Sequence, residues 1–500
     1  MPTIRSRHPE APMRRLAAPL LALALAGCAV AVPSTHDRTA APSDPLPTLA
    51  PSTSATLVPA LAIDRWWTLF DDPALTTLIE AALAHNHDLA AAAARVREAR
   101  AQLDEVRGAQ SPALELQAQS GRGRQSADTL PPGANLTGSS HSVSLAGHYD
   151  IDLWGRLAAG SDAARERLLA QEWARAALQW SLTAQLAEAH FTLRAVQRQI
   201  EISGAVRTSR ARTLDLRRRE HGAGAASEFE LRRAEAELAG TDQSLASLQR
   251  QRVALEGTVA LLAGRPLDAI ADAEPARAPL DPMQPFSARL PQGDAAALLV
   301  RRPDLRQAEA QLAVTRADIT AARAATLPAL RLSGAIGSDV RSLSNLFNGP
   351  GFVWSLAAGA TQSLLDGGQS RARVAQADAR ADAALAGYRQ TVLAAVLELR
   401  EAYAALDIDE QAQRAVGERV VALERSRSLA QLGVDSGAIG RLDLLDAERN
   451  AYQARLDEVS ATRNRLVGQV AAFKALGGGH AGVTTIAQDT PLRTQPRTQP

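Results

Sequence analysis

The chain has 500 residues, with 55 basic and 54 acidic side chains and only 3% aromatic residues. So long a chain usually folds as several globular domains, but large globular cores need more aromatic side chains than this sequence contains. Its alanine-rich composition favours long helices packed at close range. The balanced charge disfavours a nucleic-acid partner, and the single cysteine excludes an intramolecular disulfide or a cysteine-based metal cluster.

Residues 1–27 have the pattern of a secretory signal peptide. Several arginines precede an apolar run over residues 16–26, and this run is too short for a stable membrane-spanning helix. The run ends in the sequence LAGC, whose last residue is Cys28, and this resembles the processing box of bacterial lipoproteins. The resemblance implies cleavage before Cys28 and attachment of S-diacylglycerol and N-acyl chains to it, which anchor a protein to a membrane. The alternative is an ordinary signal peptide that contains an incidental cysteine.

The mature chain is predicted to begin with a tether and to continue as two copies of one unit. Residues 28–60 are rich in Pro, Ser, Thr and Ala, which predicts an extended tether. The same landmarks then occur twice in one order: a helix, two strands, a very long helix, a tight turn and a return helix. We therefore predict repeats over 61–264 and 294–479, joined by a proline-rich linker over 265–293 and followed by a disordered tail over 480–500.

Each repeat contains two segments in which apolar and polar residues alternate. They are predicted as strands over 113–124 and 140–152 in the first repeat and over 329–337 and 352–363 in the second. One apolar face is compatible with packing on a soluble core, but strands of about ten residues also have the length of a tilted membrane strand. Four strands cannot close a barrel, and open sheet edges are not tolerated in lipid. If the strands span a membrane, several chains must build the barrel together.

Each strand pair is followed by a very long helical pattern. Residues 155–220 contain no proline and repeat apolar side chains at helical spacing, and a similar stretch covers 367–432. At about 1.5 Å per residue such helices are roughly 100 Å long, which is typical of a coiled coil or a helical barrel. Glycine-rich turns follow, and return helices are predicted over 228–263 and 441–476.

An ordered set of motifs covers nearly the whole mature chain. Besides the box at Cys28, the set comprises WWTLFDDPAL at 66–75, YDIDLWGR at 149–156, RRPDLR at 301–306, LDGG at 365–368, LDLLDAER at 442–449 and KALGGG at 474–479. Together these motifs resemble the TolC/OprM-like outer membrane factor family, and specifically its lipidated NodT-type branch. No single motif is decisive, but the ordered set is highly specific.

This resemblance implies a mainly α-helical protein with a small β part that works as a homotrimer. Three chains complete a twelve-stranded β-barrel in the outer membrane and a twelve-helix tunnel through the periplasm. The implied function is that of a channel subunit in a tripartite RND-type efflux system, which passively conducts drugs or other small molecules. The implied partners are a periplasmic adaptor (membrane fusion protein), an inner-membrane RND-type pump and outer membrane lipids, and no cofactor is expected beyond the lipid on Cys28.

By the same resemblance, Leu442, Asp446 and Arg449 correspond to a periplasmic gate at the inner end of the tunnel. Their spacing of i, i+4 and i+7 places them on one face of a helix. A ring of leucines obstructs a pore by dewetting, and a ring of aspartates favours cations. Phe229 and Arg233 occupy the positions of Leu442 and Asp446 in the first repeat, so the two halves are unequal. The alternative is an ordinary solvated helix face.

The two turns correspond, again by resemblance, to the periplasmic tip that meets the adaptor. The implied contact residues are Gly224, Ala225, Ser227, Gly437 and Ala438. Family members usually have an aromatic residue three positions before the turn glycine, where this chain has His221 and Val434. Ordinary turn chemistry is the alternative explanation of the glycines.

Other functional classes receive little support from the sequence. His85 and His87 lack a third ligand and are interpreted as surface histidines rather than as a metal site, and the sequence shows no catalytic motif of an enzyme. Trp66, Trp67 and Phe70 are predicted to pack rather than to bind a ligand. The alternative function is a lipid-anchored periplasmic coiled-coil adaptor or structural protein, although the soluble barrel or lipoyl-like segments of adaptors are not recognisable.

Overall fold

The computed structural model describes residues 65–124, 126, 137–271, 301–348 and 351–477. All of them belong to the unit formed by Leu46–Pro500. The signal peptide, Cys28, the tether and the C-terminal tail lie outside the described residues, as does the linker from residue 272 onwards.

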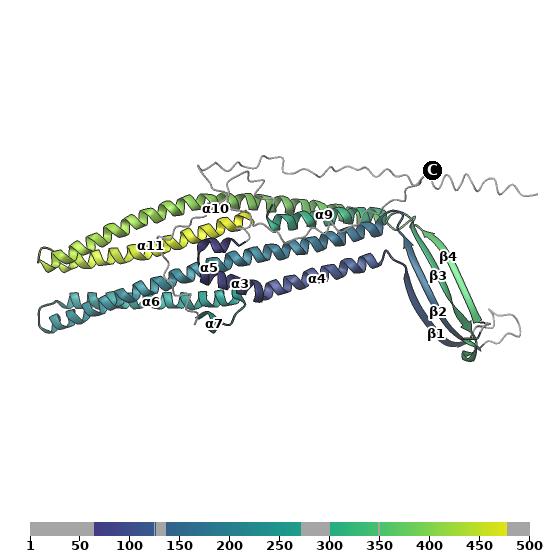
Figure 1. Cartoon of the computed structure of the whole chain (residues 1–500), viewed down its shortest axis with the longest axis horizontal. Coiled ribbons are helices and arrows are strands. Elements are labelled where there is room, and N and C mark those ends of the chain that lie inside the picture. Colours follow the sequence, from purple (N-terminus) through teal and green to yellow (C-terminus); the bar gives the residue numbers. More distant parts are fainter. Residues whose placement is uncertain (1–64, 125, 127–136, 272–300, 349–350, 478–500) are drawn as a thin grey trace, which may run out of the picture. The chain divides into compact units, whose positions relative to one another are not determined.

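Within the described part, the order of a helix, two strands, a very long helix and a return helix occurs twice, with a few short additional elements (Figure 1). The first series is η2 (Trp66–Phe70), α3 (Pro73–His85), α4 (His87–Gly108), β1 (Ala113–Arg124), β2 (Thr137–Ile151), α5 (Arg156–Gly222), α6 (Glu228–Ala263) and α7 (Leu267–Ala271). The second is α9 (Pro303–Ala324), β3 (Ala329–Val340), η5 (Leu343–Asn345), β4 (Phe352–Thr361), α10 (Gln369–Asp435) and α11 (Arg441–Leu476). The long helices and the return helices lie where their apolar spacing predicts them.

Three strands differ slightly from their predicted ends. β2 begins at Thr137 rather than at residue 140, because it stays paired with β1 until Arg124 lies opposite Thr137. β3 continues beyond residue 337 because Val340 still pairs with His141 of β2. β4 ends at Thr361, opposite the first residue of β3, rather than at residue 363. Strand ends therefore depend on the partner strand, which a local pattern does not contain.

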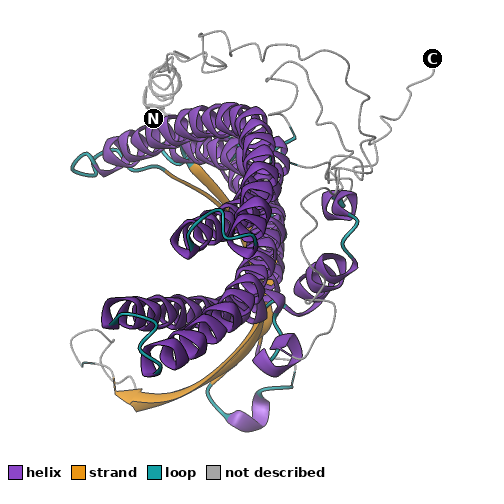
Figure 2. Cartoon of the chain, turned by 90° about the vertical axis from the view of Figure 1, so that its left-hand side faces the viewer, coloured by secondary structure: helices purple, strands orange, loops and turns teal. Residues whose placement is uncertain are grey.

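The four strands form one antiparallel sheet in the order β1-β2-β3-β4, and the sheet is curved (Figure 2). Its register places one apolar residue of each strand side by side: Leu116 lies opposite Leu145, which lies opposite Ile336, which lies opposite Trp354. Each of these side chains is at least 44% exposed. The sheet thus presents a continuous apolar row on one face and has two open edges, β1 and β4, within the described residues.

Glycines turn the chain from the sheet into the long helices. Gly155 precedes α5 with φ 73°, and Gly367 and Gly368 precede α10 with φ 62° and 88°. Glycine adopts positive φ without the steric cost that other residues incur. Each of the two helices then continues for 67 residues, which corresponds to roughly 100 Å.

The helices of the two series pack together. α5 pairs with α6 and α10 pairs with α11, while α9 contacts both α5 and α10, and α11 also contacts α5. Figure 2 shows the helices side by side along a curve. No helix within the described residues combines the length and the apolarity needed to cross a membrane.

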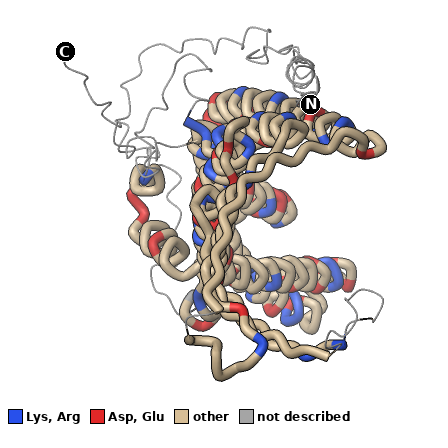
Figure 3. Tube along the Cα trace, turned by 90° about the vertical axis from the view of Figure 1, so that its right-hand side faces the viewer, with Lys and Arg blue, Asp and Glu red and all other residues tan. Residues whose placement is uncertain are grey.

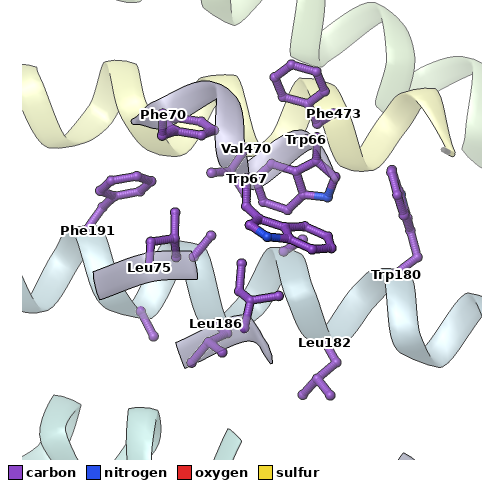
Figure 4. Packing of buried hydrophobic residues seen from close by; sticks show 14 of the residues in the cluster. Trp66, Trp67, Phe70, Leu75, Trp180, Leu182, Leu186, Phe191, Val470 and Phe473 are labelled. Carbon is purple, nitrogen blue, oxygen red and sulfur yellow. The ribbon is translucent and has the colours of Figure 1, made fainter. Parts of the chain in front are cut away.

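The largest hydrophobic core lies where η2 and α3 meet α5 and α11 (Figure 4). Trp66 is fully buried, and its ring stacks on that of Phe473 with centroids 5.7 Å apart. Phe70 packs against Phe191 with centroids 5.0 Å apart. Trp67 is also buried, so the predicted packing role of the three aromatic residues in the first motif is confirmed.

Asp72 attaches the start of α3 to α5. Its Oδ1 accepts a hydrogen bond from the backbone N–H of Leu75 at 3.0 Å, which caps α3. Its Oδ2 accepts from Nε2 of His190 at 2.9 Å and from Nη1 of Arg194 at 2.6 Å. Burial alone would raise the pKa of Asp72, but the hydrogen bond and charge of His190, the Leu75 N–H and Arg194 outweigh it and hold this pKa well below its usual value.

Arg302 makes a similar connection in the second series. Its guanidinium contacts the carboxylates of Asp304 at 2.7 Å and Glu398 at 2.8 Å, and it donates to the carbonyl oxygen of Ala475 at 3.1 Å. The arginine is buried, and such charges require partners of this kind. The RRPDLR motif therefore joins the start of α9 to α10 and to the end of α11.

Candidate functional site

Both helical hairpins end in tight turns at the end of the helices opposite the sheet (Figure 1). Gly224 and Gly437 adopt φ values of 76° and 72°, which favour glycine. Ser227 begins α6 with a reciprocal cap, because its N–H donates to Glu230 Oε2 at 3.0 Å and its Oγ accepts from the Glu230 N–H at 3.3 Å. His221 Nδ1 donates to the Ala226 carbonyl at 3.0 Å. The backbone conformation of the turns and the helix cap are therefore sufficient to explain why glycine and serine occur at these predicted contact positions.

A direct contact joins the two turns. Arg441, the first residue of α11, contacts Oε1 of Glu220 near the end of α5 at 3.3 Å. Farther from the turns, Ser203 Oγ and Tyr452 Oη lie 3.0 Å apart, again between α5 and α11. These contacts join residues that are more than 200 positions apart in the sequence, so no local spacing pattern could have identified them.

Leu442, Asp446 and Arg449 lie together along one cleft between the two hairpins. The cleft has a volume of about 440 Å³, and all three side chains line it. Each of them is about half exposed. Asp446 Oδ1 contacts Arg449 Nη2 at 3.3 Å, as their i, i+3 spacing allows. The structure thus brings the three predicted residues to a common surface.

The equivalent residues of the first series line the same cleft. Phe229 and Arg233 of α6 share it with the residues of α11. The Phe229 side chain is 73% exposed, so it is free to face the space between the hairpins. The cleft therefore brings Phe229 of the first repeat together with the acidic Asp446 of the second repeat, although the two residues are far apart in the sequence.

Charged side chains of both signs are interspersed along the helices (Figure 3), and within the cleft they form pairs. The backbone N–H of Ser227 and the nearby Arg217 lower the pKa of Glu230. Burial alone would raise the pKa of Glu424, but the hydrogen bond from Arg427 and the charge of Arg455 outweigh it and lower this pKa. Carboxylates next to guanidinium groups therefore stay ionised in the cleft at neutral pH.

The described residues contain no cluster of three metal-ligating side chains. His85 ends α3, and His87 begins α4. The residue between them, Asn86, caps α4 by accepting from the Leu89 N–H at 3.0 Å. This short junction has a structural role as a connection between two helices.

The fold and the cleft define a class of protein: a four-stranded antiparallel sheet with an exposed apolar row, continued by long helical hairpins that hold a cleft near their turns. The family model described as "Outer membrane efflux protein" matches residues 78–265 and 295–478. The chain therefore belongs to the outer membrane efflux protein family. Members of this family are channel proteins of the outer membrane that extend into the periplasm, not enzymes.

Similar proteins cover nearly the whole chain. The solvent efflux pump outer membrane protein SrpC of Pseudomonas putida is 32% identical over 423 residues, which are 84% of this chain and 88% of SrpC. Outer membrane protein OprJ of Pseudomonas aeruginosa is 32% identical over 467 residues, which are 92% of this chain and 95% of OprJ. The open-state structure of the Neisseria gonorrhoeae MtrE outer membrane channel matches with a TM-score of 0.73 and 32% identity, and covers 81% of this chain and 89% of MtrE.

Proposed function

We propose that three copies of this chain form one outer membrane channel, with a twelve-stranded β-barrel above a twelve-helix periplasmic tunnel. The observation that carries this proposal is the open sheet. Its edge strands β1 and β4 have unpaired outer sides within the described residues. Unpaired backbone groups are not tolerated in lipid. Pairing β4 of one copy with β1 of the next removes both edges.

The two faces of the sheet fit this arrangement. The row from Leu116 to Trp354 faces lipid, because its side chains are apolar and exposed in the single chain. The opposite face carries polar residues, including Asp150, whose carboxylate contacts Arg331 of the neighbouring strand at 2.7 Å. That face lines a water-filled lumen.

The cleft residues form the periplasmic gate of the channel. Leu442 and Phe229 narrow the pore with apolar side chains, which favour dewetting. Asp446 gives the constriction a negative ring, and Arg449 positions Asp446 through their ion pair. Opening requires the hairpins to move apart at the turns.

The channel works in a tripartite RND-type efflux system. The turns offer Gly224, Ala225, Ser227, Gly437 and Ala438 to a periplasmic adaptor, which links the channel to an inner-membrane RND-type pump. The conducted compounds are drugs or other small molecules, and movement through the channel is passive. Lipid on Cys28 provides a second attachment to the outer membrane, in addition to the barrel.

The alternative of a lipid-anchored periplasmic adaptor or spacer is less well supported. In such a protein the continuous apolar row of the sheet would face water, and exposed apolar patches of this kind normally mark a membrane or protein contact. Family membership and the near-complete alignment with OprJ also favour a channel over an adaptor.

The proposal is tested with full-length protein extracted from outer membranes. We expect a trimer by light scattering in detergent and pore conductance in planar bilayers. A Cys28→Ser variant tests the anchor separately: it should lose acylation measured by mass spectrometry but still form the channel. A monomer without conductance would contradict the proposed function.

A further inference from the structure

Strand β1 ends in the sequence GRGR, in which glycine and arginine alternate. Successive side chains of a strand point to opposite faces of the sheet. Arg122 and Arg124 therefore lie on the same face as Leu116, which is the lipid-facing side of the sheet, whereas Gly121 and Gly123 lie on the lumen side. Both arginines are exposed in the single chain. Their guanidinium groups thus point away from the lumen, although the interior is the polar side of a membrane barrel.

The acidic side chains of the four strands lie on the other face. Glu115 of β1, Asp150 of β2 and Asp339 of β3 are each an odd number of residues away from the member of the apolar row on their own strand, so they point to the lumen. Strand β4, which meets β1 of the next copy in the proposed barrel, contains no acidic residue. The strands of the barrel therefore supply no counter-charge to the two arginines on the lipid side.

Hydroxyl groups and a histidine accompany the two arginines on this face. Ser139 of β2 lies opposite Arg122, and Thr137 lies opposite Arg124. Closer to the apolar row, Nδ1 of His141 lies 2.8 Å from Oγ of Ser120. The lipid-facing side thus changes, towards its far end, from apolar side chains to cationic and hydrogen-bonding ones. We call this group the arginine rim, and it comprises Ser120, Arg122, Arg124, Thr137, Ser139 and His141.

The arginine rim lies at the depth of the outer lipid headgroups. The helices extend into the periplasm, so the strand ends farthest from the helices are the outer ends (Figure 1). Arg122 and Arg124 are about 30 and 36 Å along β1 from its first residue, Ala113. With a strand tilt of about 45° these lengths correspond to roughly 20 and 25 Å across the membrane, which is close to the upper limit of an apolar band about 25 Å tall.

We propose that the arginine rim binds the headgroup of a phosphorylated glycolipid in the outer leaflet. The proposal rests on the proposed channel function, because the rim reaches this layer only if the sheet spans the membrane. A planar guanidinium donates two parallel hydrogen bonds to one phosphate group. Arg122 and Arg124 are two residues apart on one face, about 7 Å along the strand, so they can contact two phosphates of one headgroup. The neighbouring hydroxyl groups are suited to hydrogen bonds with its sugar.

The test measures binding of lipid A, a glycolipid with two phosphates, to the full-length trimer in detergent by native mass spectrometry. Arg122→Gln and Arg124→Gln should each weaken binding about fivefold, and the double variant about 30-fold, because each arginine near a membrane surface contributes a similar attraction to anionic lipid. Arg331→Gln is the matched control and should leave binding unchanged, because Arg331 belongs to the same sheet but lies on the lumen face and contacts Asp150.

An isomeric variant separates a specific site from general attraction between charges. Gly121→Arg/Arg122→Gly/Gly123→Arg/Arg124→Gly keeps the composition and net charge but turns both guanidinium groups to the lumen. The lumen face has room at both positions: a Cβ at Gly121 would lie 3.8 Å from Oγ of Ser140, and one at Gly123 would meet no atom within 4 Å. This variant should bind lipid A as weakly as the double glutamine variant.

Two results would overturn the lipid site. One is equal binding of lipid A by the wild type and the isomeric variant, and the other is equal binding of the wild type to lipid A and to lipid A without its phosphates. If either result is obtained with trimers that conduct ions, the channel function stands and only the lipid site is wrong. If the wild type forms neither a trimer nor a pore, the channel function is wrong and the lipid site with it.

Discussion

Glu220 and Arg441 join the two helical hairpins at the turns, with 3.3 Å between the Oε1 and Nη1 atoms. Glu220 also accepts from Arg217 of its own helix at 2.9 Å. Arg217 thus positions the Glu220 carboxylate on α5, and the same carboxylate binds Arg441 of the other hairpin. This contact holds the start of α11 against the end of α5, so its removal should loosen the packing of the hairpins at the turns.

Arg441→Ala should therefore increase channel opening. An exposed ion pair contributes about 0.2–1 kcal/mol, so the open fraction should rise by up to about fivefold per protomer. Salt screens such pairs, and the difference from wild type should shrink as ionic strength rises. Conductance in planar bilayers at low and high salt measures both effects. Arg414→Ala is the control, because Arg414 is exposed and contacts Glu410 of its own helix; equal behaviour of the two variants would contradict the prediction.

Asp446→Ala should raise conductance and reduce the preference for cations. The substitution removes a negative ring from the constriction and leaves a smaller side chain in its place. Single-channel recordings in asymmetric KCl and entry of a large hydrophilic antibiotic into cells measure the two effects. Glu418→Ala provides a control, since Glu418 is an exposed acidic residue of α10 outside the cleft. Unchanged conductance and selectivity would remove Asp446 from the gate.

Asp72→Asn should destabilise the fold by about 3–5 kcal/mol, because His190 and Arg194 lose a buried charged partner. Asparagine still caps a helix, so the loss comes from the charge. The pKa of Asp72 is lower in the folded chain than its usual value of about 3.9. Its stabilising contribution is therefore complete above about pH 4 and is lost as pH falls towards the folded-state pKa.

Unfolding by urea, followed by circular dichroism between pH 7 and pH 3, measures this contribution. The difference between wild type and Asp72→Asn should be large at pH 7 and should decrease below about pH 4. Asp71→Asn, which changes the exposed neighbouring carboxylate, should have little effect at any pH. A difference that persists unchanged at pH 3 would show that the Asp72 charge is not its source.

Trp66→Ala and Phe473→Ala should each cost about 3–5 kcal/mol of unfolding free energy, because both rings are fully buried. The two rings stack on each other, so the double variant should lose less than the sum of the single losses. Phe347→Ala should change stability by less than about 0.5 kcal/mol, because Phe347 is 89% exposed. Additive losses in the double variant would contradict direct coupling of the rings.

Most residues of the candidate gate could be predicted from local sequence patterns. The spacing of Leu442, Asp446 and Arg449 is sufficient to place them on one helix face, and the resemblance to a family supplied their role. Neither could reveal that Arg233 of the first hairpin lines the same cleft as these three residues. Arg232 and Arg233 are adjacent arginines on one helix, and only the position of the second hairpin distinguishes the one that lines the cleft from the one that faces solvent.

The sequence by itself determined the long helices, the four strands and their repeated order, because hydrophobic periodicity and glycine turns are properties of neighbouring residues. The tertiary structure alone decided where β2, β3 and β4 end, since a strand continues only while its partner does. It also decided that Glu220 meets Arg441 and that Asp72 meets His190 and Arg194. Contacts of this kind join residues more than 100 positions apart, and they depend on how whole helices pack rather than on any spacing along the chain.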